Sequence, residues 1–191
     1  EGYHIDLGRL ERSINVRTKA IIINTPNNPT GQCLSRNDLE SIFALAQKYD
    51  FLVVADDIYT AYSYQDPFLP MMMIDPMKER TITINSFSKD YLMTGWRVGN
   101  VIAHPHIIQT IQAVNERVAF TAPSISQRAA IHAIRHRKEI QDDYINEYRK
   151  RVFYAAERVG RISWMSVPEP KGTFYLFVNV KKSGLTSVEV S

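Results

Sequence analysis

The chain has 191 residues, of which 45% are hydrophobic and 23% are charged. That length supports one ordinary domain, or one domain and part of a second, with a sizeable core. The formal net charge is only +3, and the basic clusters at 135–138 and 149–151 are interleaved with acidic residues. Such clusters are typical of a solvated helix face, which argues against a nucleic-acid-binding protein.

The single cysteine, Cys33, excludes an internal disulfide framework and a cysteine-based zinc site. No apolar stretch is long enough to span a bilayer, and the first residues show no signal-peptide pattern. We therefore expect a soluble, cytoplasmic protein that binds neither nucleic acid nor a membrane.

Short apolar runs mark the expected strands, at 20–24, 51–55, 81–85 and 98–103. Continuous runs rich in β-branched residues are typical of strands buried on both faces, as in a parallel sheet. Between the first two, Ser35 and Asp38 form a capping-box pattern, followed by apolar residues at helical spacing as far as Tyr49. Strand, helix and strand with short connections predict a βαβ unit in an α/β protein.

From about His104 the pattern becomes helical, with Ser124 and Gln127 as a second expected capping box. An apolar stripe between Tyr144 and Val159 predicts a helix that ends at Gly160. A strand-like run from 173 to 180 follows. We place a domain boundary near residue 140, so that 1–140 form an α/β layer and 141–191 begin a second domain.

Three polar residues, Asn28, Asp56 and Lys89, each come just after an expected buried strand. In parallel α/β sheets ligands bind outside these strand ends, so the three residues predict one site. A lysine in a partly desolvated site can form a Schiff base with an aldehyde, and a carboxylate can pair with a protonated ring nitrogen. Pyridoxal phosphate is the cofactor that needs both groups.

Binding of this cofactor would also need other residues near these strand ends. Its ring hydroxyl needs hydrogen-bond donors, which the Asn28 amide and the Tyr59 phenol could supply. Its phosphate needs hydroxyls and a guanidinium, and the candidates close to Lys89 are Ser86, Ser88 and Arg97. We expect no metal ion, because His132 and His136 lack the glutamate of a zinc-protease motif.

These residues belong to motifs that, in this order, resemble the class I/II aminotransferases of pyridoxal-phosphate fold type I. The motifs are Asn24-Thr25-Pro26-Asn27-Asn28-Pro29-Thr30-Gly31, Asp56-Asp57-Ile58-Tyr59, Ser86-Phe87-Ser88-Lys89 and Thr94-Gly95-Trp96-Arg97-Val98-Gly99. The resemblance covers nearly the whole chain. It implies that 1–140 are the second half of the large cofactor-binding domain, and that 141–191 are the truncated beginning of the small α+β domain.

The resemblance also implies a role for each site residue. Lys89 is the expected Schiff-base lysine, and Asp56 the expected partner of the ring nitrogen. Asn28 and Tyr59 are expected on the ring oxygen, and Ser86 and Arg97 on the phosphate, with Ser88 as a weaker candidate. We prefer Asp56 to Asp57 because the family's aspartate lies three positions before its tyrosine, and because residue 57 of an extended segment should face the other side.

The expected activity is that of an aminotransferase, a homodimer acting on an amino acid and a 2-oxo acid. Lys89 is expected to release the cofactor to the amino acid and then to move a proton. Two alternatives share the motifs: a carbon–sulfur lyase or decarboxylase on the same fold, and an aminotransferase-like sensor domain of a transcriptional regulator. Relatives have a phosphate-capping loop, a stacking aromatic and a carboxylate-binding arginine beyond these 191 residues, so we expect the isolated chain to be inactive.

Overall fold

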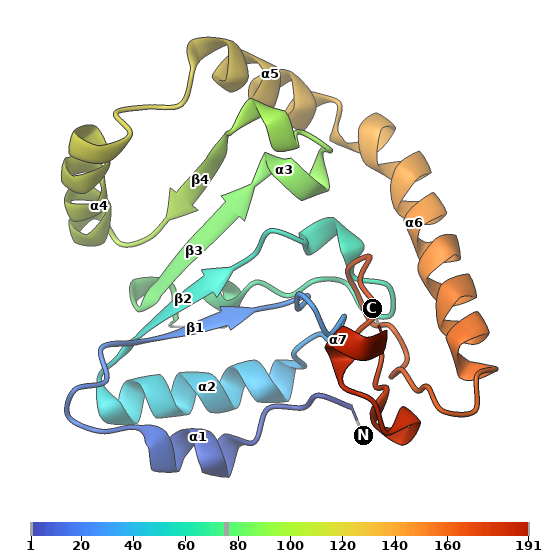
Figure 1. Cartoon of the computed structure of the whole chain (residues 1–191). Coiled ribbons are helices and arrows are strands. Elements are labelled where there is room, and N and C mark those ends of the chain that lie inside the picture. Colours follow the sequence, from blue (N-terminus) through green and yellow to red (C-terminus); the bar gives the residue numbers. More distant parts are fainter. Residues whose placement is uncertain (1, 75–76, 191) are drawn as a thin grey trace.

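In the computed structural model, which describes residues 2–74 and 77–190, a four-stranded sheet is flanked by helices (Figure 1). The strands lie in the order β1 (Ala20–Asn24), β2 (Leu52–Asp56), β3 (Thr81–Ser86) and β4 (Gly99–Ile102). The first three strands run parallel, and β4 pairs with β3 in the antiparallel direction. The predicted α/β class with a mostly parallel sheet is confirmed.

The remaining elements connect and surround these strands (Figure 1). The α-helices are α1 (Leu7–Ser13), α2 (Arg36–Tyr49), α3 (Phe87–Asp90), α4 (Pro105–Val118), α5 (Ser124–Arg135), α6 (Arg137–Gly160) and α7 (Ser187–Val190). Short 3₁₀ turns are η1 (Thr60–Tyr62), η2 (Met71–Met73), η3 (Met77–Glu79), η4 (Thr94–Trp96) and η5 (Lys181–Ser183). None of the described helices combines the length and apolar character needed to cross a bilayer.

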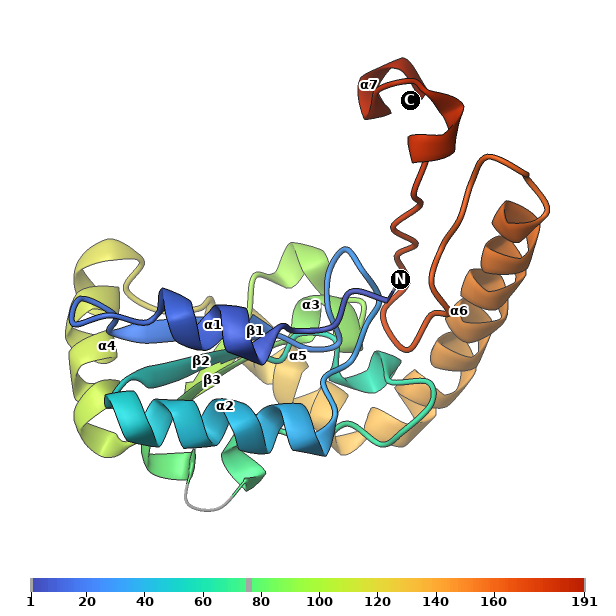
Figure 2. The same ribbon diagram turned by 90° about the horizontal axis from the view of Figure 1, so that it is seen from below.

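Helix α2 begins at the predicted capping box and covers one face of the sheet (Figure 2). The Ser35 hydroxyl accepts a hydrogen bond from Asp38 N at 3.2 Å, and Ser35 N donates to the Asp38 carboxylate at 2.8 Å. These bonds satisfy backbone groups that the first turn of a helix leaves free. The buried side of α2 packs on the same side chains of β1 and β2 that form the main core, among them Ile23, Val53 and Ala55.

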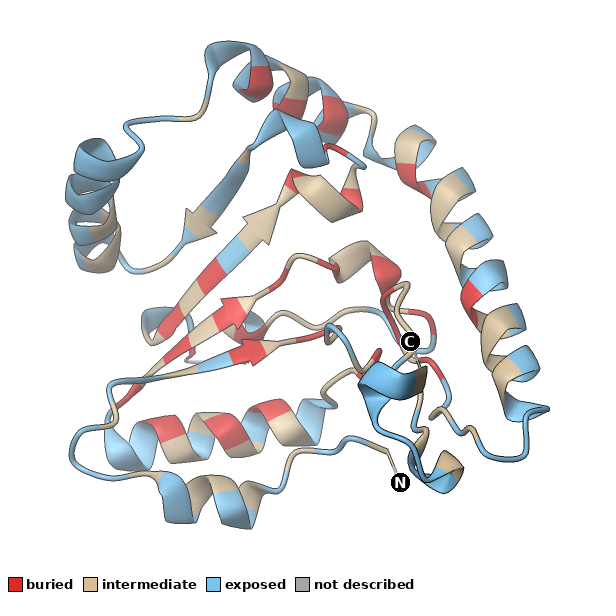
Figure 3. Ribbon diagram, in the orientation of Figure 1, coloured by how far each residue is buried: buried red, intermediate tan, exposed pale blue. Residues whose placement is uncertain are grey.

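Burial alternates along the strands as a pleated sheet requires (Figure 3). Val53 and Ala55 are fully buried beneath α2, whereas Val54, between them, is half-buried on the opposite face. On that opposite face Ile22 of β1 is 74% exposed. The apolar side chains of α2 and the sheet each stabilise the fold by about 1.5–3 kcal/mol when fully buried.

Helix α6 lies along one side of the molecule and runs without a break across residue 140 (Figure 1). Its apolar stripe packs on η1 and on the chain near Phe174, and the helix ends at Gly160 as predicted. Tyr62 is the centre of this cluster, with its ring centroid 5.7 Å from Tyr148 and 5.1 Å from Phe174. The domain boundary near residue 140 stays a prediction.

Two local predictions are wrong. Helix α5 begins after Pro123, and no described side chain caps it, because the Gln127 amide donates instead to the Ala122 carbonyl at 2.7 Å. The run from 173 to 180 is not a strand, because no strand among the described residues lies beside it to form a ladder. It makes only isolated bridges at its margins, Ser63 with Gly172 and Ser166 with Asn179. Helix α1 was not predicted.

Candidate active site

The register of the sheet brings the three predicted strand ends to one edge. Asn24 at the end of β1 lies beside Asp56 at the end of β2, and Asp56 lies beside Ile84 of β3. The Asn24 amide donates to the Asp56 carbonyl at 2.9 Å, which ties the first two strand ends together. Side chains that follow these ends therefore share one edge of the sheet, as expected for a parallel α/β site.

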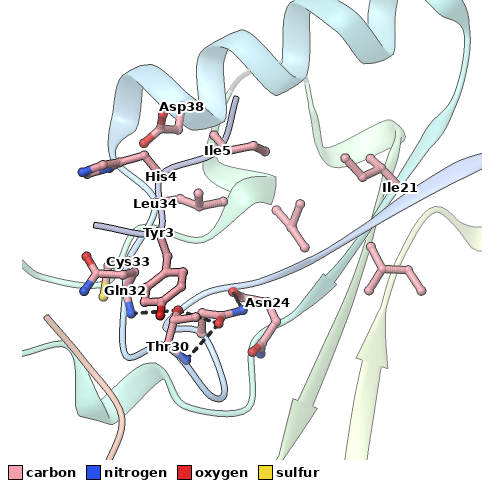
Figure 4. A pocket seen from close by; sticks show the side chains of 13 residues that line it. Tyr3, His4, Ile5, Ile21, Asn24, Thr30, Gln32, Cys33, Leu34 and Asp38 are labelled. Carbon is pink, nitrogen blue, oxygen red and sulfur yellow. Dashed lines mark hydrogen bonds between the residues drawn. The ribbon is translucent and has the colours of Figure 1, made fainter. Parts of the chain in front are cut away.

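The turn after β1 carries Asn28 between two cis peptide bonds, Thr25–Pro26 and Asn28–Pro29. Asn24 Oδ1 accepts from Asn28 N at 2.7 Å, and Asn27 Oδ1 accepts from the Thr30 hydroxyl at 2.6 Å. Figure 4 shows this turn at the rim of a cavity of about 240 Å³, which lies on the β1 side and is also lined by Tyr3 and Leu34. Side-chain hydrogen bonds thus hold the turn in one shape.

Asn28 meets Tyr59, which follows β2. The Asn28 amide Nδ2 donates to the Tyr59 hydroxyl at 3.2 Å, across 31 residues of sequence. Tyr59 is buried, and this burial is the main cause that raises its pKa, so the phenol keeps its proton at neutral pH. Asn28 and Tyr59, both expected on one ring oxygen, therefore lie within hydrogen-bond distance of each other.

Asp56 and Asp57 lie in different surroundings. The Asp56 carboxyl is half-buried, and burial raises its pKa. Asp57 is 2% exposed, and neither of its carboxyl oxygens has a hydrogen-bond partner among the described residues. It lines a cavity of about 440 Å³ with Thr83 and Met72, on the sheet face that also carries Ala55. The alternation expected from the sequence thus separates the two carboxyls.

Lys89 lies in the short helix α3, directly after β3. The Ser86 hydroxyl caps this helix by accepting from Ser88 N at 3.0 Å. The Lys89 side chain is half-buried, with Nζ 6.0 Å from the centroid of the Phe174 ring. Within the described part of the chain, Nζ makes neither a hydrogen bond nor an ion pair.

Asp90, which the sequence analysis did not single out, anchors the Lys89 turn. Its buried carboxylate accepts from the Thr60 hydroxyl at 2.5 Å and from Ala61 N at 3.3 Å. Burial is the main cause that raises the pKa of Asp90, to about 6. Its carbonyl accepts from the Gln141 amide at 2.7 Å and from the Tyr144 hydroxyl, so both η1 and α6 hold this turn. No local signal marks a residue whose role depends on partners 29 to 54 positions away.

The segment with Arg97 returns beside the start of α3. Ser86 lies opposite Gly99, and Phe87 N donates to the Val98 carbonyl at 3.3 Å. A Cβ at Gly99 would lie 2.6 Å from the Asn85 carbonyl oxygen, so this approach requires glycine. The Arg97 side chain is exposed and donates to the Thr94 carbonyl at 3.1 Å. Ser86 and Arg97 thus lie on adjoining segments, and Ser88 contacts Ser86 only through its backbone.

Tyr175 is a second polar residue at this edge that sequence reasoning missed. Its hydroxyl lies 3.2 Å from the Tyr59 hydroxyl, and the two rings meet edge to face with centroids 5.9 Å apart. Tyr175 comes from the chain after α6, which returns to the turn between β1 and α2. There Gly172 N donates to the Gly31 carbonyl at 2.8 Å.

The protein is an α/β protein with a candidate active site at the ends of its parallel strands. This site holds the half-buried Asp56 carboxyl, the Lys89 amine, which has no partner among the described residues, and the hydrogen-bonded Asn28–Tyr59 pair. Similarity to known proteins shows which family of α/β proteins it is. The sequence model of the class I and II aminotransferases matches residues 1–190. The chain therefore belongs to the class I and II aminotransferase family.

Individual relatives agree with that assignment. An aspartate aminotransferase of Pyrococcus abyssi is 36% identical over 192 residues, which cover 99% of this chain and 49% of that protein. An aromatic-amino-acid aminotransferase of Thermococcus litoralis is 34% identical, with the same coverage of the two chains. The solved structure of an aromatic aminotransferase from Pyrococcus horikoshii matches with a TM-score of 0.95 at 33% identity, covering 100% of this chain and 52% of that one. The chain spans about half the length of these relatives.

Replacing Gly172 with alanine should destabilise the fold. A Cβ there would lie 2.6 Å from the Pro26 Cβ and 2.7 Å from the Tyr62 carbonyl oxygen. Backbone and a proline ring cannot move aside easily, so we expect Gly172→Ala to lower the unfolding free energy by about 1–3 kcal/mol. The matched control is Gly160→Ala, because a Cβ there would lie more than 4 Å from every neighbouring atom of the described chain. Denaturant unfolding should separate the variants, and equal midpoints would contradict the close approach.

The stability of the chain should fall as the pH rises from about 4 to 7. Burial, with smaller contributions from Asp56 and Asp90, raises the pKa of Asp57 from 3.8 to about 7. In that window the folded chain holds a proton that the unfolded chain releases, so stability is present at low pH and is lost on the way to pH 7. The loss from this one group should be on the order of 2–4 kcal/mol.

The variant Asp57→Asn removes this charge while keeping the side-chain shape. We expect it to flatten the dependence of the unfolding free energy on pH and to stabilise the chain at pH 8, leaving a smaller slope from Asp90, whose pKa is also raised. Asp143→Asn, at an exposed position on α6, is the control and should retain the full slope. An unchanged slope in Asp57→Asn would show that this carboxyl is charged in the folded chain at pH 5.

Proposed function

We propose that the whole protein is a pyridoxal-phosphate-dependent aminotransferase, which moves an amino group from an amino acid to a 2-oxo acid. The observation that carries this proposal is the hydrogen bond between Asn28 and Tyr59 at the same strand-end edge as Asp56 and Lys89. Membership of the aminotransferase family supports it.

The residues at this edge fit the cofactor. Neither the Asp56 carboxyl nor Lys89 Nζ is engaged in a hydrogen bond or ion pair with another described residue, although both side chains are half-buried. Partly buried charged groups without a partner are costly unless a ligand engages them. The Asp56 carboxyl suits a basic ring nitrogen, and the Asn28–Tyr59 pair suits a ring oxygen. The Lys89 amine, near the Phe174 ring, suits an aldehyde. Pyridoxal phosphate has all three groups.

Asp56 would hold the proton on the ring nitrogen of the cofactor. Burial raises the pKa of its carboxyl, which makes the carboxylate a stronger hydrogen-bond acceptor for that proton. Asn24 supports this role by donating to the Asp56 carbonyl, which fixes the end of β2. Asp57 has no such role in this proposal, because it faces the other side of the sheet.

Asn28 and Tyr59 would donate to the ring oxygen. The hydroxyls of Ser86 and Ser88 and the guanidinium of Arg97, which lie on adjoining segments, would bind the phosphate. Arginine suits this task because its planar fork can bind two oxygens at once. Arg97 would have to exchange its present bond to the Thr94 carbonyl for the phosphate.

Lys89 would hold the cofactor covalently through Nζ and then act as the proton carrier. When bound, pyridoxal phosphate supplies an electron sink that stabilises negative charge on the substrate α-carbon. When it is not covalently linked, Lys89 Nζ would accept the proton from the substrate α-carbon. It would then donate this proton to the C4′ carbon of the cofactor. The anchoring of the Lys89 turn by Asp90, Tyr62 and Tyr144 keeps the amine in reach during both steps.

The proposal also covers the substrates and the oligomeric state. The substrates are an amino acid and a 2-oxo acid, and the whole protein is a homodimer.

Product analysis of the whole protein, loaded with pyridoxal phosphate, tests this proposal. Incubation with an amino acid and 2-oxoglutarate should yield glutamate and the matching 2-oxo acid in equal amounts. A β-substituted amino acid offered alone is the second assay, in which pyruvate and ammonia would indicate a lyase instead. Absence of glutamate with all common amino acids would contradict the proposed transfer.

A further inference from the structure

We infer that Tyr175 is a positioning residue of this site, whose hydroxyl donates to the Tyr59 hydroxyl and so leaves the Tyr59 proton for the ring oxygen of the ligand. The inference deepens the proposed function and rests on it. Tyr175 lies 116 residues after Tyr59 in the sequence, so this role depends on the folding of the chain after α6 onto the site.

The count of donors and acceptors at the Tyr59 oxygen gives the direction of this bond. A phenol hydroxyl has one proton to donate and two lone pairs that accept. The Asn28 amide nitrogen can only donate, so it occupies one lone pair at 3.2 Å. Tyr175, also at 3.2 Å, can either accept the Tyr59 proton or donate to the second lone pair. When a ligand oxygen takes the Tyr59 proton, only donation by Tyr175 remains.

The backbone around Tyr175 is held in place for this role. Tyr175 N donates to the Thr173 hydroxyl at 3.2 Å, and Thr173, which is fully buried, donates through its own N to the Tyr62 carbonyl at 3.0 Å. Gly172 N in turn bonds the Gly31 carbonyl, at the end of the turn that carries Asn28. One short segment is thus bonded both to the Asn28 turn and to η1, which follows Tyr59.

Donation to Tyr59 should strengthen Tyr59 as a donor. Hydrogen bonds in a chain polarise one another, so a hydroxyl that accepts two bonds releases its own proton more readily to an acceptor. Tyr175 therefore acts on the ligand through Tyr59. Its removal should weaken the bond from Tyr59 to the ring oxygen and make that oxygen more basic.

The first test is a pH titration of the visible absorption band of the whole protein loaded with pyridoxal phosphate. We expect Tyr175→Phe to raise the midpoint of the band change by about 0.3–1 pH unit, and Tyr59→Phe to raise it further. The matched control is Tyr148→Phe. Its ring belongs to the same aromatic cluster, 5.3 Å from Phe174, but its hydroxyl bonds no described side chain. A midpoint in Tyr175→Phe equal to that of Tyr148→Phe would overturn the inference.

The second test uses the unloaded protein, with ¹³C at the ζ carbon of its tyrosines. The Tyr59 resonance should move in Tyr175→Phe and stay in place in Tyr148→Phe, and an unmoved resonance in Tyr175→Phe would overturn the hydrogen bond itself. Together the two tests distinguish failure of the Tyr175–Tyr59 hydrogen bond from failure of the proposed function. A moved Tyr59 resonance without any absorption band in the loaded wild type would refute the proposed function, and with it the ligand role of Tyr175, but not the bond.

Discussion

Borohydride reduction of the whole protein in the presence of pyridoxal phosphate should place a covalent adduct on Lys89. Peptide mass analysis would locate it. The reason is that the Lys89 side chain is half-buried at the strand-end edge, with Nζ near the Phe174 ring and without an ion-pair partner among the described residues. Lys89→Ala should remove the adduct and lower turnover by about 10⁴-fold or more, because both the covalent link and the proton carrier are lost.

Two other lysines serve as controls. Lys78 in η3 and Lys138 in α6 lie outside the strand-end edge. Their replacement by alanine should leave both the adduct and the turnover unchanged. An adduct on either of them that persists in Lys89→Ala, with turnover retained, would show that the lysine has been wrongly assigned.

The second large effect is expected at Asp56. Asp56→Ala should lower turnover by about 10²–10³-fold, because a fixed charge that stabilises the reacting state contributes that much in a partly buried site. The half-buried carboxyl lies at the end of β2, where Asn24 fixes the backbone. Steady-state rates should be measured together with the amount of bound cofactor, so that weak binding is distinguished from slow chemistry.

The neighbouring carboxyl provides the comparison for this experiment. Asp57→Ala removes the same chemical group one residue away, but from the buried side of the sheet. We expect Asp57→Ala to change stability rather than the rate per folded molecule. Equal losses of turnover in Asp56→Ala and Asp57→Ala would contradict the assignment of the two faces.

Much of the candidate site is predictable because it depends on local patterns. Asn28, Asp56 and Lys89 each follow a short apolar run, and parallel strands bring such ends to one edge. The capping box of Ser35 and Asp38 is likewise local, since its two bonds join residues three apart. The expected strand from 173 to 180 fails for the opposite reason. Strand formation needs a partner, and a run of suitable residues does not show whether one is present.

Local sequence patterns are enough to predict the α/β class, the positions of β1 to β3, the capped start of α2 and the residues that gather at the strand ends. The reason is that apolar periodicity and capping chemistry act over a few residues. Three features become visible only in the folded chain: Asp90 anchors the Lys89 turn, Tyr175 reaches Tyr59, and the buried Asp57 carboxyl has no hydrogen-bond partner among the described residues. Each of these depends on which distant segments pack together. The packing of α6 and of the chain after it on η1 sets the contacts of Asp90 and Tyr175, and no local pattern encodes that packing.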